Sequence, residues 1–324
     1  MEFNISKIET NNIKLDKQNL FILQKLNENS RCSLQELSSK LNLSKPAVSN
    51  RIEQLKKEKI LLNPMIVINF NNLDYTAWSI YLKTTIHYEN KDFYKKLNLE
   101  NIVEVIGLYG EYSIYIKFIT KTEAEKDKII TNIIKTLEVK DYQYYKVNSY
   151  DIIPAKKYID EKKLNILTPY KLNITKLDLD ILKLIANNPE ISNIEISKKL
   201  QVSFQKISYH IKNLFVSRTI LLSCYFSNIF LFNMLSYMIM FDLKDKEIKN
   251  SFSNFLLSYN NTNGVSIFEG KEDIMCIFIS KSLFDFHEFF DIISKKYPGK
   301  INKFNISLIQ TQFYMNHFPT CIKI

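Results

Sequence analysis

Residues 33–55 read SLQELSSKLNLSKPAVSNRIEQL, and residues 192–214 read SNIEISKKLQVSFQKISYHIKNL. The two stretches align without a gap, and most apolar positions that differ exchange only Leu, Ile and Val. The identical pairs are Ser33/Ser192, Glu36/Glu195, Ser38/Ser197, Lys40/Lys199, Leu41/Leu200, Ser44/Ser203, Ser49/Ser208, Ile52/Ile211 and Leu55/Leu214. An internal repeat determines the architecture, because each repeat is one structural unit. We call the two halves of the chain copy 1 and copy 2.

Each copy carries the signals of two helices joined by a tight turn. Ser33 and Ser192 begin an S-x-x-E pattern, in which the hydroxyl caps the helix and the glutamate returns a bond to the cap. Ser44 and Ser203 are predicted to cap the second helix, which we call the reading helix. Apolar residues recur at helical spacing in both helices and in a further helix upstream. Three helices with a short turn before the last one are typical of a helix-turn-helix unit.

The outer face of each reading helix bears on function. In copy 1 it combines amides that read base edges with cations that bind phosphates. The candidate DNA-binding residues are Lys45, Ser49, Asn50, Arg51, Gln54, Lys56 and Lys57 in copy 1, and Gln205, Lys206, Ser208, Tyr209, His210 and Lys212 in copy 2. A purely structural three-helix bundle is the alternative for each copy. It has more weight for copy 2, where the face is less basic and Phe204 and Phe215 flank it.

Composition favours an anionic partner and gives no sign of a cofactor. The chain has 324 residues, with 44 basic and 34 acidic ones and a net charge of +10. Such a charge favours an anionic partner but does not identify it; double-stranded DNA is the partner expected from the motifs. The four cysteines are far apart and show no ligand spacing, so we expect no metal site, no disulfide and no cofactor. Free thiols, and an N-terminal stretch without an apolar core, favour a cytoplasmic protein.

About ninety residues of a different character follow each helix-turn-helix. They predict the order β-α-β-β-α-β twice, with glycine hairpins at Gly110 and Gly270. In copy 1 the strands are expected over 76–86, 101–108, 112–120 and 141–152, and the helices over 91–99 and 123–138. In copy 2 the strands are expected over 235–243, 264–269, 273–280 and 303–314, and the helices over 246–258 and 282–297.

The predicted fold class is α+β, with two winged helix-turn-helix units each followed by a βαββαβ ferredoxin-like sensing domain. We expect the first winged unit over 1–70 and its sensing domain over 71–153. A linker over 154–175 contains Pro154 and Pro169. The second pair is expected over 176–230 and 231–324. The uncharged stretch 220–241 is long enough for a membrane helix, but polar residues interrupt it. Two buried strands are the favoured interpretation.

In these features the chain resembles the Lrp/AsnC family of feast/famine transcription regulators. The residues that carry the resemblance are Leu15, Asp16, Ile22, Leu23, Glu36, Leu37, Leu41, Leu43, Ser44, Val48, Arg51, Ile52 and Leu55, with the glycine hairpins at 107–113 and 270–273. The chain departs from the family pattern at Asn19, at Lys59 and Arg218, and at His210, which stands where copy 1 has Arg51.

The resemblance implies a DNA-binding transcription regulator and not an enzyme. It also implies an amino-acid-like effector near the middle-strand hairpin, and sensing domains that pair between subunits. Two sensing domains in one chain would pair within it as a pseudo-dimer, or between chains as a homo-oligomer. No membrane partner is expected.

Two alternatives from other classes stay open. Fused siroheme decarboxylases, which are enzymes of haem biosynthesis, also resemble two joined Lrp/AsnC units. A porphyrin with several carboxylates favours bidentate arginine clamps. The arginines of this chain are Arg31, Arg51 and Arg218, all inside the helix-turn-helix units. The other alternative is an interaction scaffold whose helix-turn-helix units do not bind DNA.

Overall fold

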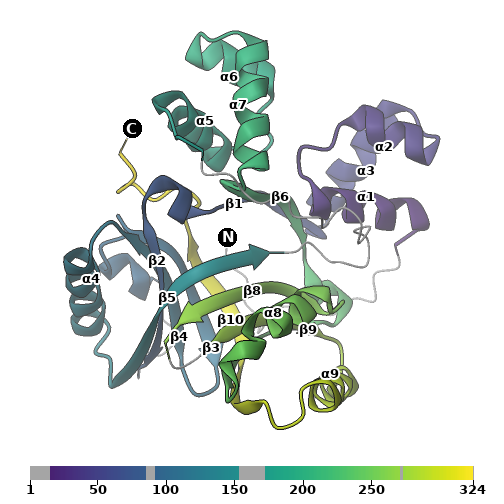
Figure 1. Ribbon diagram of the computed structural model, residues 1–324. Coiled ribbons are helices and arrows are strands. Elements are labelled where there is room, and N and C mark those ends of the chain that lie inside the picture. Colours follow the sequence, from purple (N-terminus) through teal and green to yellow (C-terminus); the bar gives the residue numbers. More distant parts are fainter. Residues whose placement is uncertain (1–14, 85–91, 153–171, 271–272, 324) are drawn as a thin grey trace. The chain divides into compact units, whose positions relative to one another are not determined.

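The computed structural model describes residues 15–84, 92–152, 172–270 and 273–323. They form two compact units, and each unit takes segments from both copies (Figure 1). The helical unit comprises residues 15–73 and 172–232, and the barrel unit comprises 74–152 and 233–323. The division into four domains stays a prediction, and most of the expected linker lies outside the described residues.

The helical unit contains the two predicted helix-turn-helix motifs. Copy 1 forms α1 (Lys17–Glu28), α2 (Leu34–Leu41), α3 (Lys45–Lys57) and β1 (Leu61–Ile68). Copy 2 forms α5 (Lys176–Asn187), α6 (Asn193–Leu200), α7 (Phe204–Val216) and β6 (Ile220–Ser227). The reading helices are therefore α3 and α7.

The predicted serine caps are confirmed at all four helix starts, which are Ser33, Ser44, Ser192 and Ser203. The reciprocal bond of the S-x-x-E pattern forms only in copy 2, where Glu195 accepts from the Ser192 N–H at 2.9 Å. In copy 1 this part of the prediction is wrong. There Glu36 accepts from the Cys32 thiol at 3.3 Å and lies 3.5 Å from Lys40, so its carboxylate is turned to other partners.

The two copies meet at an antiparallel ribbon of β1 and β6, which pairs Met65 with Cys224 at its centre. Tyr225 of β6 is buried in the core of copy 1 beside α1 and α3. The loop after α1 also reaches copy 2, where the Ser30 N–H donates to the Ser223 carbonyl at 2.7 Å. Because copy 2 contributes a paired strand and a core tyrosine to copy 1, the helical unit is a single folded unit built from both copies.

The barrel unit is a closed eight-stranded barrel with the order β10-β3-β4-β2-β5-β8-β9-β7. Copy 1 supplies β2 (Thr76–Lys83), β3 (Ile102–Tyr109), β4 (Ile114–Thr120) and β5 (Asp141–Ile152). Copy 2 supplies β7 (Leu235–Leu243), β8 (Thr262–Glu269), β9 (Ile274–Ser280) and β10 (Ile301–Met315). The pairs β5–β8 and β10–β3 join the two halves. The predicted α+β fold class is confirmed.

The uncharged stretch 220–241 forms β6 and most of β7, as predicted. Across the described residues, the structure contains no helix with the length and apolarity needed to span a membrane.

Helices α4 (Glu123–Thr136), α8 (Lys249–Ser258) and α9 (Leu283–Lys296) pack outside the barrel strands (Figure 1). The helix expected over 91–99 is wrong in type. Residues Phe93–Lys96 form a short 3₁₀-helix, and Lys91 lies outside the described residues. Leu97 is then extended, and both Phe93 and Leu97 are buried in the core of the copy 1 half of the barrel.

The inner faces of the two barrel halves differ in polarity. Side chains on a strand alternate between faces, so residues flanking the helix-covered ones point inward. The inward residues of copy 1 include Ser79, Tyr81, Glu104, Tyr115 and Lys117, and the matching residues of copy 2 are Met238, Met240, Gly264, Met275 and Ile277. Only copy 1 thus has ionisable side chains at these positions. Burial raises the pKa of Glu104 and lowers the pKa of Lys117 to about 8.

Candidate nucleic-acid interface

Helix α3 presents the most polar outer face of the helical unit. Ser44 caps it, Lys45 is its first residue and Pro46 lies in its first turn. Lys45, Asn50 and Lys57 are exposed, and among the described residues none of these three has a hydrogen-bond or ion-pair partner. Gln54 is exposed and donates to Glu58 at 2.9 Å. Two cations and an amide are therefore available to a ligand, because no polar contact with the described part of the chain occupies them.

Arg51 instead fastens α3 to the start of α1. Its guanidinium donates to Asp16 at 2.7 Å and to Asn19 at 2.9 Å. Asp16 is also the cap of α1 and accepts from the Asn19 N–H at 2.6 Å. The Asn19 N–H and the Arg51 guanidinium together hold the pKa of Asp16 below its usual range. We call this contact the copy 1 brace.

Copy 2 has a brace in the same place with different chemistry. His210, which stands where copy 1 has Arg51, lies 2.7 Å from Asp178 through Nδ1. Asp178 is only 2% exposed, and its other oxygen accepts from Thr175 in a capping box at the start of α5. The carboxylate has thus moved from the cap of the first helix to its third residue, and a shorter imidazole replaces the guanidinium.

Two cations of copy 1 contact copy 2 within the helical unit. Lys56 lies 3.1 Å from Glu190 and 5.4 Å from the centre of the Tyr225 ring. Arg31 donates to the Pro189 carbonyl at 3.1 Å and to Asn193 at 2.6 Å, and burial lowers its pKa. These contacts help to hold the two motifs together, and Glu190 offsets the charge of Lys56.

Helix α7 presents a face that mixes polar and aromatic groups. Gln205, Lys206 and Lys212 are exposed, whereas the half-buried Ser208 accepts from Asn193 at 3.1 Å. Phe204 and Tyr209 are 47% and 63% exposed. These two aromatic side chains replace Lys45 and Asn50 of copy 1 at the matching positions.

The two braces and the contacts of Arg31 and Lys56 were not foreseen from the sequence. The only signal was a polar pair at the start of each first helix, Asp16 with Asn19 and Thr175 with Asp178. That pair predicts a helix cap, but nothing in it indicates that a side chain about thirty-five residues later binds the same carboxylate.

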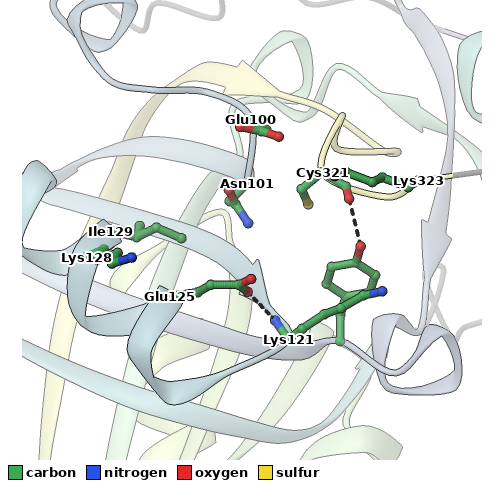
Figure 2. Close-up of a pocket in the computed structure, with 9 residues that line it drawn as sticks. Glu100, Asn101, Lys121, Glu125, Lys128, Ile129, Cys321 and Lys323 are labelled. Atoms are coloured by element: carbon green, nitrogen blue, oxygen red, sulfur yellow. Dashed lines mark hydrogen bonds between the residues drawn. The ribbon is translucent and has the colours of Figure 1, made fainter.

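The barrel unit has a hollow of about 390 Å³ at the end of β3 that lies away from the Gly110 hairpin. It is lined by Tyr75, Glu100, Asn101, Lys121, Glu125, Lys128, Ile129, Cys321 and Lys323 (Figure 2). The Tyr75 hydroxyl donates to the Cys321 carbonyl at 2.8 Å, and the Lys121 ammonium lies 5.0 Å from the centre of the Tyr75 ring. Side chains of both charge signs therefore surround one small space.

The middle-strand hairpin of copy 1 is closely covered. A Cβ on Gly110 would lie 2.6 Å from the Ser307 hydroxyl oxygen and 3.0 Å from the Ile306 carbonyl, both on β10. Only glycine fits at position 110, because the backbone of β10 leaves no room for a Cβ atom. Gly270, its counterpart, has a φ of 135°, which side chains rarely adopt.

Comparisons with known proteins agree with the motifs. A family model for the AsnC-type helix-turn-helix domain matches residues 15–56, and one for winged helix-turn-helix DNA-binding matches residues 174–214. The HTH-type transcriptional regulator Ptr1 of Methanocaldococcus jannaschii is 34% identical over 101 residues, which cover 30% of this chain and 67% of Ptr1.

The chain belongs to the Lrp/AsnC family of transcription regulators. Regulatory protein AsnC of Haemophilus influenzae is a further relative, 25% identical over 127 residues that cover 38% of this chain and 84% of AsnC. Both relatives match only about a third of this Lrp/AsnC protein, as expected for a duplicated chain.

One similarity in fold extends over the whole chain. The siroheme decarboxylase NirDL matches with a TM-score of 0.63 at 10% sequence identity, and the match covers 94% of each chain. At this identity the likeness concerns the fold alone. It indicates that two joined units of this kind occur together in another solved protein.

Proposed function

We propose that this Lrp/AsnC protein binds double-stranded DNA sequence-specifically, with α3 as its main reading helix, and that it acts in the cytoplasm as a regulator and not as an enzyme. The observation that carries the proposal is that α3 exposes two lysines and an asparagine that have no polar partner among the described residues. Lys45 and Lys57 at its two ends supply charge for phosphates, and Asn50 between them supplies an amide for a base edge. Arg51 and Lys56 contribute mainly by holding the motif in place.

Retardation of labelled genomic fragments at increasing salt tests the proposal. A protein that neutralises several phosphates loses about 10³–10⁵ in affinity between about 50 and 200 mM salt. Lys45→Ala with Lys57→Ala should flatten the log–log slope by about two, one for each lost phosphate contact. Lys135→Ala, an exposed lysine of α4, is the matched control. Salt-independent binding, or an equal effect of the control, would contradict the proposal.

We further propose that one chain is a complete DNA-binding unit. The β1–β6 ribbon and the closed barrel both pair copy 1 with copy 2 inside a single chain, and this supports a pseudo-dimer. Its half-sites should differ, since the two reading helices differ. Light scattering of the complex gives the number of chains on one duplex. Two chains on a perfect inverted repeat would overturn this proposal in favour of a homo-oligomer.

An amino-acid-like effector is the small-molecule partner that we propose. We place its site in the hollow of the barrel unit and not at the middle-strand hairpin that the family resemblance implies, because β10 lies close against Gly110 in that hairpin. An amino acid carries one carboxylate and one ammonium, and the hollow offers three lysines and two glutamates in a volume suited to such a molecule. Lys121 lies just before α4, and Lys128 lies in its second turn. The N-terminus of a helix also favours an anion.

Thermal unfolding of the protein with each amino acid in turn tests the effector proposal, because a ligand that binds only the folded state raises the melting temperature. Lys128→Ala with Lys323→Ala should abolish any such rise, whereas Lys135→Ala should preserve it. A rise that survives the double substitution would place the effector elsewhere.

A second candidate function rests on the similarity in fold to NirDL. Addition of an iron tetrapyrrole followed by absorbance in the Soret region tests it directly. We expect no shifted band, because the barrel unit lacks arginine for bidentate binding of the porphyrin carboxylates. A saturable band shift at one equivalent would favour the enzyme.

A further inference from the structure

The aromatic side chains of α7 are unusual for the outer face of a reading helix. Phe204 is the first residue of the helix, Gln205 follows it, and Tyr209 lies on the next turn. In helix-turn-helix proteins the N-terminal residues of this helix contact the base edges in the major groove. Phe204 and Tyr209 thus occupy positions from which base edges are read, and neither is buried in the core of the motif.

The surroundings of these aromatic residues are basic. Helix α7 has no acidic residue and carries Lys206 and Lys212 on exposed positions. Lys198 and Lys199 are exposed near the end of α6, just before the turn. An apolar patch with lysines around it is complementary to a groove that has anionic edges and an apolar group on its floor. The major groove of duplex DNA has this form wherever thymine presents its methyl group.

We infer that copy 2 reads thymine through the C5-methyl groups, with Phe204 and Tyr209 as the contacting side chains. The inference rests on the proposed DNA-binding function and names the sequence class that copy 2 selects. Guanine is best read by bidentate arginine, and α7 contains none. Gln205 lies between the two aromatic residues and is suited to the adenine of the same or a neighbouring T·A pair.

Replacing thymine by deoxyuridine tests the inference, because uracil pairs with adenine but lacks the methyl group. A duplex selected by the protein is resynthesised with one such replacement at a time. We expect one or two thymines at which affinity falls about threefold to tenfold, the range set by burying one methyl. In Phe204→Ala or Tyr209→Ala the same replacement should cost nothing, whereas Asn50→Ala in copy 1 should leave its cost unchanged.

The controls separate this inference from the proposed function. The exposed fractions of Phe204 and Tyr209 are 47% and 63%, and both lie outside the core of the motif, so the variants should unfold close to the parent temperature. Phe204→Leu keeps an apolar contact and should retain part of the deoxyuridine effect. Salt-sensitive DNA binding without any deoxyuridine effect, or with an effect that the alanine variants keep, overturns the inference alone. Absence of DNA binding by the parent protein overturns the proposed function as well.

A protein contact is the competing explanation of the exposed aromatic residues. If Phe204→Ala and Tyr209→Ala abolish self-association in sedimentation and leave DNA affinity and the deoxyuridine effect as in the parent, the aromatic residues form a contact between copies of the chain, and the inference is wrong.

Discussion

The two helix-turn-helix motifs share their helices and caps but divide their polar chemistry differently. In copy 1 the cation of the brace, Arg51, is partly exposed and bridges two acceptors, while the face of α3 remains hydrophilic. In copy 2 the brace is the His210–Asp178 contact, with the carboxylate buried, and the face of α7 is partly aromatic. Duplication therefore preserved the position of the brace and changed both its partners and the outer face.

This difference shows that a residue's match to a family motif does not determine which partners its side chain contacts in the folded chain. Arg51 matches the family pattern and is a candidate DNA contact, and within the chain its guanidinium binds Asp16 and Asn19 at the start of α1. Phe204, with Phe215, weakens the sequence argument for copy 2, and yet Phe204 lies with the candidate Tyr209 in the N-terminal turns of α7. Three predictions sharpen the comparison, beginning with the largest expected effect.

The faces of α3 and α7 should contribute unequally to affinity. Replacing Lys45, Asn50 and Lys57 together by Ala removes two phosphate contacts and one base contact, and we expect about a hundredfold loss at moderate salt. Replacing Lys206 and Lys212 together should cost about tenfold, because only phosphate contacts are removed. Titration of one labelled duplex by fluorescence anisotropy measures both. A larger loss from the copy 2 variant would reverse the assignment of the main reader.

The braces should differ in their contribution to stability. His210→Ala removes the partner of one oxygen of a buried carboxylate, and we expect the free energy of unfolding to fall by about 1–3 kcal/mol. Arg51→Ala breaks a partly exposed ion pair and should cost less than about 1 kcal/mol. Urea unfolding followed by circular dichroism measures both values. Equal losses would show that burial of Asp178 is not the deciding difference.

The barrel halves extend the comparison, because Lys117 of copy 1 faces inward where copy 2 has Ile277. Burial depresses the pKa of Lys117 from 10.5 to about 8, so above about pH 8 the unfolded chain binds more protons than the folded one. The contribution of Lys117 to the free energy of unfolding should then rise between about pH 8 and 9.5, by at most about 1.4 kcal/mol per unit. Burial raises the pKa of the four cysteine thiols, which opposes this rise in the parent, so the contribution is measured as the difference between the parent and Lys117→Met.

The free energy of unfolding of the parent minus that of Lys117→Met should rise with pH over this window, whereas the parent minus Ile277→Met should stay constant. Trp78, the only tryptophan of the chain, lies in the copy 1 half of the barrel and reports its unfolding by fluorescence. A difference between the parent and Lys117→Met that does not change with pH would contradict the prediction.

Much of the fold follows from the sequence. The repeat, the serine caps, the spacing of apolar residues and the glycine hairpins depend on local physical rules, and these rules operate within a few residues. They predict the helices of both motifs, the order of strands along each half of the barrel and the location of the reading helices. They also favour strands over a membrane helix for residues 220–241, because polar residues interrupt the apolar run.

The tertiary structure alone decided which residues meet across long separations. Tyr225 completes the core of copy 1, Arg51 binds Asp16, and Lys117 lies inside a barrel built from both copies. None of these contacts has a local signal, since each depends on how the copies pair and not on the sequence around either partner. The repeat leaves pairing within one chain and pairing between chains equally consistent. The β1–β6 ribbon and the closed barrel join the copies within the chain, because that pairing satisfies the strand edges of each half.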